Sequence, residues 1–213
     1  MIKETISAAE ARRFYNRLGE AHDRGGRFER AAKAAGLAAL DCQAGDWALN
    51  AGVGTGKEQR LLQQAVGADG RTCGIDLART MLDITRRRVP QTLLCEGDIG
   101  RLPYAAASFD RLLCSYVLDL LPLAAIPAVL AEFRRVLRED GRLVLVSLTE
   151  GVDLPSKALV TLWKTAYRIH PLSCGGCRPL QLASLTRSAG FHTVERAVIV
   201  QLGVPSELII ATP

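Results

Sequence analysis

Short apolar runs that alternate with helical patterns are the feature that most constrains how this chain can fold. The predicted strands are 47–50, 72–76, 92–96, 111–116, 142–147, 193–201 and 206–211. The predicted helices between them are 57–66, 80–88, 126–137 and 180–189. Strands separated by helices of about 10–15 residues are typical of βαβ units. The sequence therefore predicts an α/β fold with a mostly parallel, seven-stranded sheet and helices on both faces.

A glycine-rich turn follows the first predicted strand directly. It reads Asn-Ala-Gly-Val-Gly-Thr-Gly over residues 50–56 and leads into a helix. Glycine lets the backbone turn sharply and lets a ligand approach without interference from a Cβ. Asp76 ends the second strand, where a carboxylate can accept hydrogen bonds from both ribose hydroxyls of an adenosine-containing ligand. The turn and Asp76 together predict such a ligand site.

Two other ligand classes fit this turn less well. A P-loop requires a Ser or Thr after the Gly-Lys pair to hold Mg²⁺, and Glu58 stands there instead. A dinucleotide site prefers Gly-x-Gly-x-x-Gly, whereas Gly52, Gly54 and Gly56 are evenly spaced. An adenosyl cofactor without phosphates is favoured over both, and an NAD-dependent oxidoreductase stays as the less favoured alternative.

The ordered set of motifs resembles the class I S-adenosylmethionine-dependent methyltransferases. The glycine turn resembles their first motif, and Gly-Ile-Asp-Leu-Ala-Arg-Thr-Met-Leu at 74–82 resembles the second. Segments 96–99, 102–104, 108–110, 133–137 and 141–143 resemble the later motifs in the same order. The resemblance covers about residues 12–150 and is strongest to the quinone-biosynthesis and phospholipid methyltransferases. It implies the Rossmann-like class I methyltransferase fold and methyl transfer from S-adenosyl-L-methionine to a small-molecule or lipid-like acceptor at C, N or O.

The chain is predicted to be one domain, 1–213, because its length and its 48% hydrophobic and 23% charged residues suit a single well-buried core. Within it we predict four segments. They are an N-terminal helical cap (5–40), the cofactor-binding core (45–150), an inserted lid helix and loop (152–178), and a C-terminal helix with a strand pair (179–213). Extra helices beside the carboxyl ends of the strands are either lids or packing helices.

The resemblance also implies which residues bind the cofactor. Asp76 would hold the ribose and Asp98 the adenine amino group, while Leu77 and Ile99 would pack against the base, with Met81 beside them. For these three apolar residues, ordinary core packing is an equal alternative. The full predicted cofactor set is Tyr15, Asn50, Gly52, Gly54, Gly56, Asp76, Leu77, Met81, Asp98, Ile99 and Ser115.

Asn50 departs from the resemblance, because the family normally has Asp or Glu at this position. Its amide brings no charge to the methionine ammonium group of the cofactor. Either the cofactor binds more weakly, or Glu58 or another carboxylate compensates. The substitution also keeps open a second function, a non-catalytic protein that binds S-adenosylmethionine.

Candidate catalytic and acceptor residues lie outside the motifs. Segment 15–23 resembles the stretch that closes over the methionine end of the cofactor in the family, and it carries His22 where a tyrosine is usual. An imidazole there could serve as a general base, or could simply be solvated. Tyr116 is the second catalytic candidate. The predicted substrate-binding residues are Tyr116, Asp119, Trp163, Tyr167 and Arg178.

The cysteines predict no metal or redox centre. Cys174 and Cys177 form a Cys-x-x-Cys pair, but a zinc site would require two more ligands and a redox pair normally opens a helix in a thioredoxin-like setting. Cys73, Cys95 and Cys114 lie in strand-like runs, where a free thiol behaves as a small hydrophobe. We therefore expect reduced thiols and no bound metal.

Charge and hydropathy limit the classes of partner that the sequence predicts. The net charge is +5 and the pI about 9.0, but the arginines are scattered along helix faces and aromatics make up 5%. Nucleic-acid binding requires a clustered basic surface or stacking aromatics, so no nucleic-acid partner is predicted. Transient contact with an anionic membrane surface stays open. No signal or spanning segment is recognised, and we predict a cytoplasmic protein of undetermined oligomeric state.

Overall fold

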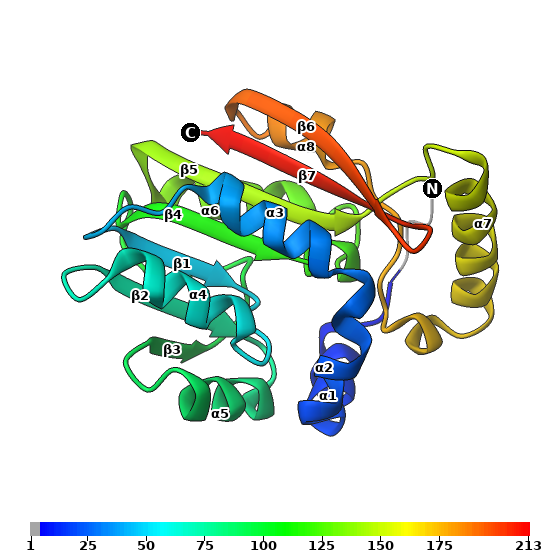
Figure 1. Ribbon diagram of the computed structural model, residues 1–213, viewed down its shortest axis with the longest axis horizontal. Coiled ribbons are helices and arrows are strands. Elements are labelled where there is room, and N and C mark those ends of the chain that lie inside the picture. The colour runs from blue at the N-terminus through cyan, green and yellow to red at the C-terminus, as the bar shows by residue number, and fades with distance from the viewer. Residues whose placement is uncertain (1–4) are drawn as a thin grey trace.

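The computed structural model describes residues 5–213, apart from the side chains of residues 24, 25 and 27. A seven-stranded sheet crosses the molecule in the order β3-β2-β1-β4-β5-β7-β6 (Figure 1). Strands β1 to β5 pair in parallel, and β7 runs antiparallel to both of its neighbours. The mostly parallel, seven-stranded α/β sheet predicted from the alternating pattern is confirmed, and so is the Rossmann-like class I methyltransferase fold that the resemblance implies.

The observed strands match the predicted ones closely. Their bounds are β1 Trp47–Ala51, β2 Arg71–Asp76, β3 Leu93–Glu96, β4 Phe109–Ser115, β5 Leu137–Leu148, β6 His192–Gln201 and β7 Val204–Thr212. The largest difference is β5, which begins at Leu137 rather than at residue 142. The chain leaves the preceding helix directly into the sheet, and a register irregularity between Phe109 and Arg111 of β4 accommodates the early start.

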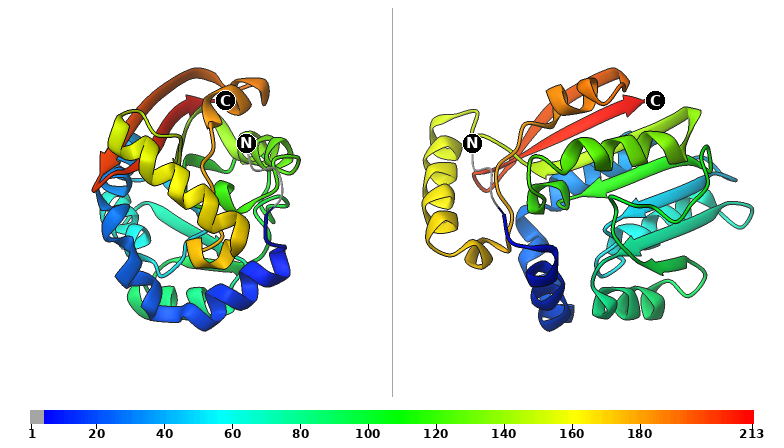
Figure 2. Two further views of the ribbon diagram at one scale, coloured as in Figure 1. Left: turned by 90° about the vertical axis from the view of Figure 1, so that its right-hand side faces the viewer. Right: turned by 180° about the vertical axis from the view of Figure 1, so that it is seen from behind.

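The helices of the alternating core are α4 Lys57–Val66, α5 Arg79–Arg88, α6 Ile126–Val136 and α8 Leu182–Ser188. Helices α3 and α4 lie on one face of the sheet, and α6 and α8 lie on the other (Figures 1 and 2). Alternation along β4 explains this arrangement: Leu112 packs in the cluster that contains α6, while Leu113 packs against α3 and α4. Both faces are therefore buried, as in other parallel sheets.

Two further groups of helices lie outside the alternating strand–helix pattern, although α3 itself packs on the sheet. The first contains α1 Ala8–Leu18, η1 Gly19–Ala21, α2 His22–Gly25, η2 Gly26–Phe28 and α3 Arg30–Leu40; the second contains α7 Leu154–Ile169 and η4 Pro171–Cys174. Segment 118–120 forms a further short helix, η3. Viewed from the carboxyl ends of the parallel strands, α1 to α3 and α7 frame the end of the sheet (Figure 2, left). The division into cap, core, lid and C-terminal segments stays a prediction.

Local capping explains where the two outer helices begin. Ser7 caps α1 through a reciprocal pair with Glu10, and Asp153 caps α7 through a similar pair with Ser156. Within the described residues, no helix is long and apolar enough to cross a membrane.

Candidate functional site

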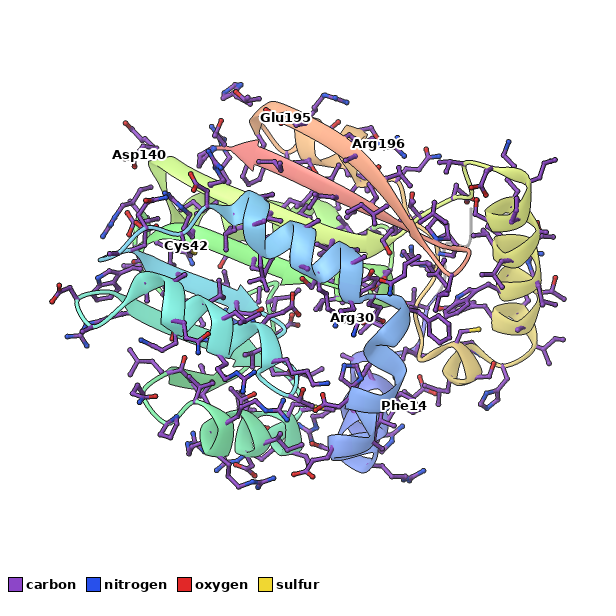
Figure 3. The ribbon with its side chains drawn as sticks, in the orientation of Figure 1. Phe14, Arg30, Cys42, Asp140, Glu195 and Arg196 are labelled. Carbon is purple, nitrogen blue, oxygen red and sulfur yellow. The ribbon has the colours of Figure 1, made fainter. Side chains whose placement is uncertain are left out.

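A cavity of about 990 Å³ lies at the carboxyl ends of β1, β2 and β4. The strand order reverses direction there, because β2 and β3 continue to one side of β1 while β4 and β5 continue to the other. Open α/β sheets bind ligands at such a point. Residues of α1 and α3 complete the wall, including Arg30, which Figure 3 labels at the start of α3.

The glycine turn forms the floor of this cavity. Gly52, Gly54 and Gly56 all have positive φ values, of 83°, 55° and 78°. A Cβ at Gly52 would approach Val117 Cγ2 to 2.2 Å, whereas a Cβ at Gly54 would meet nothing within 4 Å. Gly52 is thus required for packing, and Gly54 leaves the backbone open to a ligand.

Asp76 anchors the same turn from the end of β2. Its carboxylate accepts hydrogen bonds from the backbone N–H groups of Gly54 and Ala78, both at 2.9 Å. Burial raises the pKa of Asp76, and these backbone bonds act against the rise. The side chain is fixed at the cavity wall, where its oxygens can also accept hydrogen bonds from vicinal hydroxyls.

The wall beside β2 and β3 is suited to a flat base. Asp98 accepts a hydrogen bond from Gly100 N–H at 2.8 Å, which fixes its carboxylate. Leu77, Met81 and Ile99 line the cavity in this region. These three side chains offer apolar surface beside the Asp98 carboxylate, which is a hydrogen-bond acceptor.

The structure brings most of the predicted cofactor residues together. Those that line the cavity are Tyr15, Gly52, Gly54, Asp76, Leu77, Met81, Asp98, Ile99 and Ser115. Gly56 and Asn50 do not. Gly56 precedes the first residue of α4 and lies close to Thr85. Asn50 is buried in β1, and its Nδ2 has no hydrogen-bond partner among the described residues. The cofactor roles themselves stay predictions.

His22 and Tyr15 lie together at the cap. Their rings meet edge-on with centroids 5.7 Å apart, and both line the cavity. Burial, assisted by the charge of Lys33, lowers the pKa of His22, so its imidazole is neutral at neutral pH. The Tyr15 hydroxyl donates to Gly175 O at 3.0 Å, which ties the cap to the loop after α7.

Tyr116 lines the cavity, and its hydroxyl group is held by a hydrogen bond. Its hydroxyl shares a hydrogen bond of 2.6 Å with Ser206 Oγ, and Lys33 Nζ lies 5.3 Å from its ring centroid. Burial raises the pKa of Tyr116, so the phenol keeps its proton. The hydroxyl of Tyr116 is therefore held by Ser206 and protonated, and it does not offer a basic oxygen to an acceptor.

The other four predicted acceptor residues are not among the residues that line the cavity. Asp119 and Arg178 are fully buried; Asp119 accepts from Leu148 N–H at 3.2 Å, and Arg178 donates to Leu121 O. Trp163 donates to Cys177 O at 2.9 Å. Tyr167 is buried, and its hydroxyl has no hydrogen-bond partner in the described part of the chain. Hydrogen bonds of Asp119, Trp163 and Arg178 thus connect the segment after α7 with η3, and η3 with β5.

Sequence reasoning missed the charged residues of α3 in the wall. Lys33 Nζ lies 2.8 Å from Glu29 and 3.8 Å from Glu58, and Ser115 donates to Glu58 at 2.8 Å. Burial acts to lower the pKa of Lys33, but the two carboxylates outweigh it and raise the pKa. Lys33 is the only charged residue in the run of small and apolar residues 31–40, and this feature of the sequence could have indicated a charged group in the cavity wall.

The cysteines and metal ligands add no further site. All six cysteines are free thiols, and Cys177 is the member of the Cys-x-x-Cys pair that lines the cavity. Across residues 5–213 as described, no group of three or more His, Cys, Asp or Glu side chains is arranged to hold a metal ion.

Comparison with known proteins identifies a methyltransferase domain in this chain. Residues 49–145 match the family described as methyltransferase domain. The chain is 37% identical over 171 residues to an uncharacterized 37.1 kDa transposon protein of Streptomyces fradiae, covering 76% of this chain and 48% of that one. It is 30% identical over 139 residues to the demethylmenaquinone methyltransferase of Lactobacillus johnsonii, covering 62% and 54%. The chain spans about half the length of these curated relatives.

A solved structure shares the fold across nearly the whole chain. Magnesium protoporphyrin IX methyltransferase from Synechocystis PCC 6803, solved with bound SAH, superposes with a TM-score of 0.73 and 16% identity. The match covers 96% of this chain and 98% of that one. At 16% sequence identity, this similarity shows a shared fold and nothing more specific.

Proposed function

Since this chain carries a domain of the class I S-adenosylmethionine-dependent methyltransferase family, we propose that it transfers a methyl group from S-adenosyl-L-methionine to a small-molecule or lipid-like acceptor. The observation that carries the proposal is one cavity that combines the open backbone at Gly54 with the half-buried, hydrogen-bonded carboxylate of Asp76. The site lies where the strand order reverses. An adenosine-containing ligand fits these groups without any phosphate cradle.

The described residues fit the cofactor part by part. Asp76 would accept hydrogen bonds from the ribose hydroxyls. Asp98 would accept a hydrogen bond from the adenine amino group, beside Leu77 and Ile99. The backbone at Gly54 has room for the chain that links ribose to the amino acid. When bound, S-adenosylmethionine supplies an activated methyl group on a sulfonium, so the protein has mainly to orient the acceptor and exclude water.

The remaining cavity suits an apolar acceptor. Val117, Leu120, Leu121, Val129 and Leu37 contribute to its lining. A volume of about 990 Å³ is at the upper end of small-molecule sites, large enough for the cofactor and a second ligand together. The named relative acts on demethylmenaquinone, a lipid-like quinone precursor, which supports an acceptor of that class.

His22 is the residue we assign as general base. It lines the cavity, and its lowered pKa leaves the imidazole neutral and able to accept a proton from the acceptor. His22→Ala is expected to reduce the single-turnover rate with a demethylmenaquinone analogue by about 10²-fold or more, with unchanged affinity for S-adenosylmethionine. The rate of the unsubstituted protein should hold to below pH 6.5 and then fall as His22 is protonated. A wild-type rate in the variant would remove His22 from the mechanism.

The central proposal is tested by titration calorimetry of the protein with S-adenosylmethionine, S-adenosylhomocysteine and NADH in parallel. Micromolar binding of the first two without binding of NADH is the expected result. Binding of NADH alone would overturn the proposal in favour of an oxidoreductase. Cofactor binding without turnover of any quinone or lipid acceptor would instead favour the non-catalytic binding protein.

We also propose that the protein meets its acceptor at the cytoplasmic face of an anionic membrane. The exposed side chains of α7 form a stripe along residues 154, 158, 162, 165 and 169, of which Leu154, Leu162 and Ile169 are 85%, 66% and 81% exposed. The turn between β6 and β7 adds Leu202 beside it, because Gly203 lies against Leu159. Free thiols throughout the chain suit a reducing compartment.

The charge of α7 supports an anionic surface as its partner. Helix Leu154–Ile169 contains Lys157, Lys164 and Arg168 and no acidic residue. Lys164 pairs with Glu150, while Lys157 and Arg168 are exposed. An apolar stripe flanked by basic side chains is typical of helices that lie in a membrane interface.

A pair of charge substitutions tests this surface. Leu162→Glu with Ile169→Glu should abolish co-sedimentation with vesicles containing phosphatidylglycerol, since each buried side chain of this size contributes about 1.5–3 kcal/mol. Leu93→Glu, at an exposed residue of β3, is the matched control and should bind as the unsubstituted protein does. Equal binding of all three, or no binding by the unsubstituted protein, would contradict the assignment.

A further inference from the structure

Glu29, Lys33 and Glu58 form a charged cluster within the cavity wall, which we call the α3–α4 cluster. Lys33 bridges the two carboxylates, and Ser115 Oγ donates to Glu58 Oε1. All four side chains line the cavity. Glu58 is the second residue of α4, so its position follows directly from the glycine turn.

The cluster has one negative charge in excess. Two carboxylates share one ammonium group, and the longer of the two ion pairs, 3.8 Å, is the one to Glu58. The neighbouring carboxylate Asp23 is in the opposite situation, because Arg88 and Lys57 both pair with it. Four arginines line the cavity: Arg88 is the one paired with Asp23, and the other three, Arg12, Arg30 and Arg60, are exposed and screened by solvent.

The strand order fixes where this charge lies along a bound ligand. Asp98 follows β3, Asp76 ends β2, the glycine turn follows β1, and Ser115 ends β4; these strands are adjacent in that order. A ligand with its base near Asp98 and its ribose at Asp76 therefore extends past the glycine turn toward Ser115 and Glu58. In S-adenosylmethionine, the part beyond the ribose is the methionine portion with its positively charged α-ammonium group.

Asn50 does not provide a charge for that group. It is uncharged, it does not line the cavity, and its Nδ2 is buried without a partner among the described residues. Resting on the proposed function, we infer that Glu58, held by Ser115 and accompanied by Glu29 and Lys33, binds the α-ammonium group of the cofactor. The binding carboxylate is thus moved from the end of β1 to the first turn of α4.

The inference is tested by calorimetry of Glu58→Gln with three ligands. S-adenosylmethionine and S-adenosylhomocysteine both carry the ammonium group, whereas 5′-methylthioadenosine keeps the adenosine and lacks the amino acid. Glu58→Gln should weaken binding of the first two by about tenfold or more, the scale for losing a hydrogen bond to a charged group. Binding of methylthioadenosine should be unchanged, which also shows that the variant is folded. Ser115→Ala, which keeps the carboxylate and removes its hydrogen bond, should give a smaller loss.

Each other outcome overturns the inference in a distinguishable way. Equal weakening of all three ligands would assign Glu58 to the shape of the glycine turn and leave the proposed function standing. A loss confined to S-adenosylmethionine would assign its charge to the sulfonium rather than to the ammonium group. Unchanged affinities would exclude Glu58 as a ligand. If the unsubstituted protein binds none of the three, the proposed function itself fails.

Discussion

Replacing Arg178 with alanine is expected to lower the free energy of unfolding by about 2–5 kcal/mol, the range for truncating a large buried side chain. Arg178 is fully buried and its guanidinium donates to Leu121 O, while its backbone N–H donates to Asp119 O at 3.2 Å. The guanidinium charge also interacts with the buried carboxylate of Asp119. Truncation would leave a cavity of nearly a whole side chain and a carboxylate without its nearby cation.

Urea unfolding of two matched variants separates these causes. Arg178→Met keeps most of the volume and removes the charge, and we expect it to cost less than Arg178→Ala. Burial raises the pKa of Asp119 to about 7, so this carboxyl can become neutral when its cation is absent. If both variants unfold at the midpoint of the unsubstituted protein, Arg178 does not support the segment after α7.

Asp76→Ala is expected to weaken binding of S-adenosylmethionine by about 1–3 kcal/mol, the range for losing a hydrogen-bonded charged group. The loss has two sources, because Asp76 would hold the ribose and already holds the N–H groups of Gly54 and Ala78. Calorimetry gives the affinity directly. In contrast to Glu58→Gln, this substitution should weaken 5′-methylthioadenosine as well, since that ligand keeps the ribose.

Two controls make the Asp76 result decisive. Asp76→Asn retains one acceptor oxygen and should lose less affinity than Asp76→Ala. Asp83→Ala changes an exposed carboxylate on α5 and should bind like the unsubstituted protein. Unchanged affinity in Asp76→Ala would exclude Asp76 from the ribose site and place the cofactor elsewhere in the cavity.

The core strands and the floor of the site were readable from local sequence. Predicted helix 57–66 has the observed bounds of α4, and Asp76 ends β2 as predicted. Apolar runs and positive-φ glycines are local requirements of the backbone, so each leaves its mark within a few residues. Their order along the chain then limits how the strands can be arranged.

The acceptor side was much harder to predict. Asp119 follows β4, Trp163 and Tyr167 lie in α7, and Arg178 follows α7, yet none of these four residues lines the cavity. Whether a side chain after a strand faces a cavity or the protein interior depends on the elements packed beside it. Here the loop after α7 folds back onto η3, and that contact turned Arg178 inward.

By itself, the sequence determined the alternating α/β fold, the glycine turn and the carboxylate at the end of the second strand, because each leaves a pattern among residues close in the chain. Only the tertiary structure brought Lys33 and Glu29 from the N-terminal helices to Glu58 and Ser115. It also showed that Asn50 is buried and lies outside the cavity. The physical reason is that the net charge of a site depends on which distant side chains are buried together, and helical or strand periodicity carries no record of that pairing.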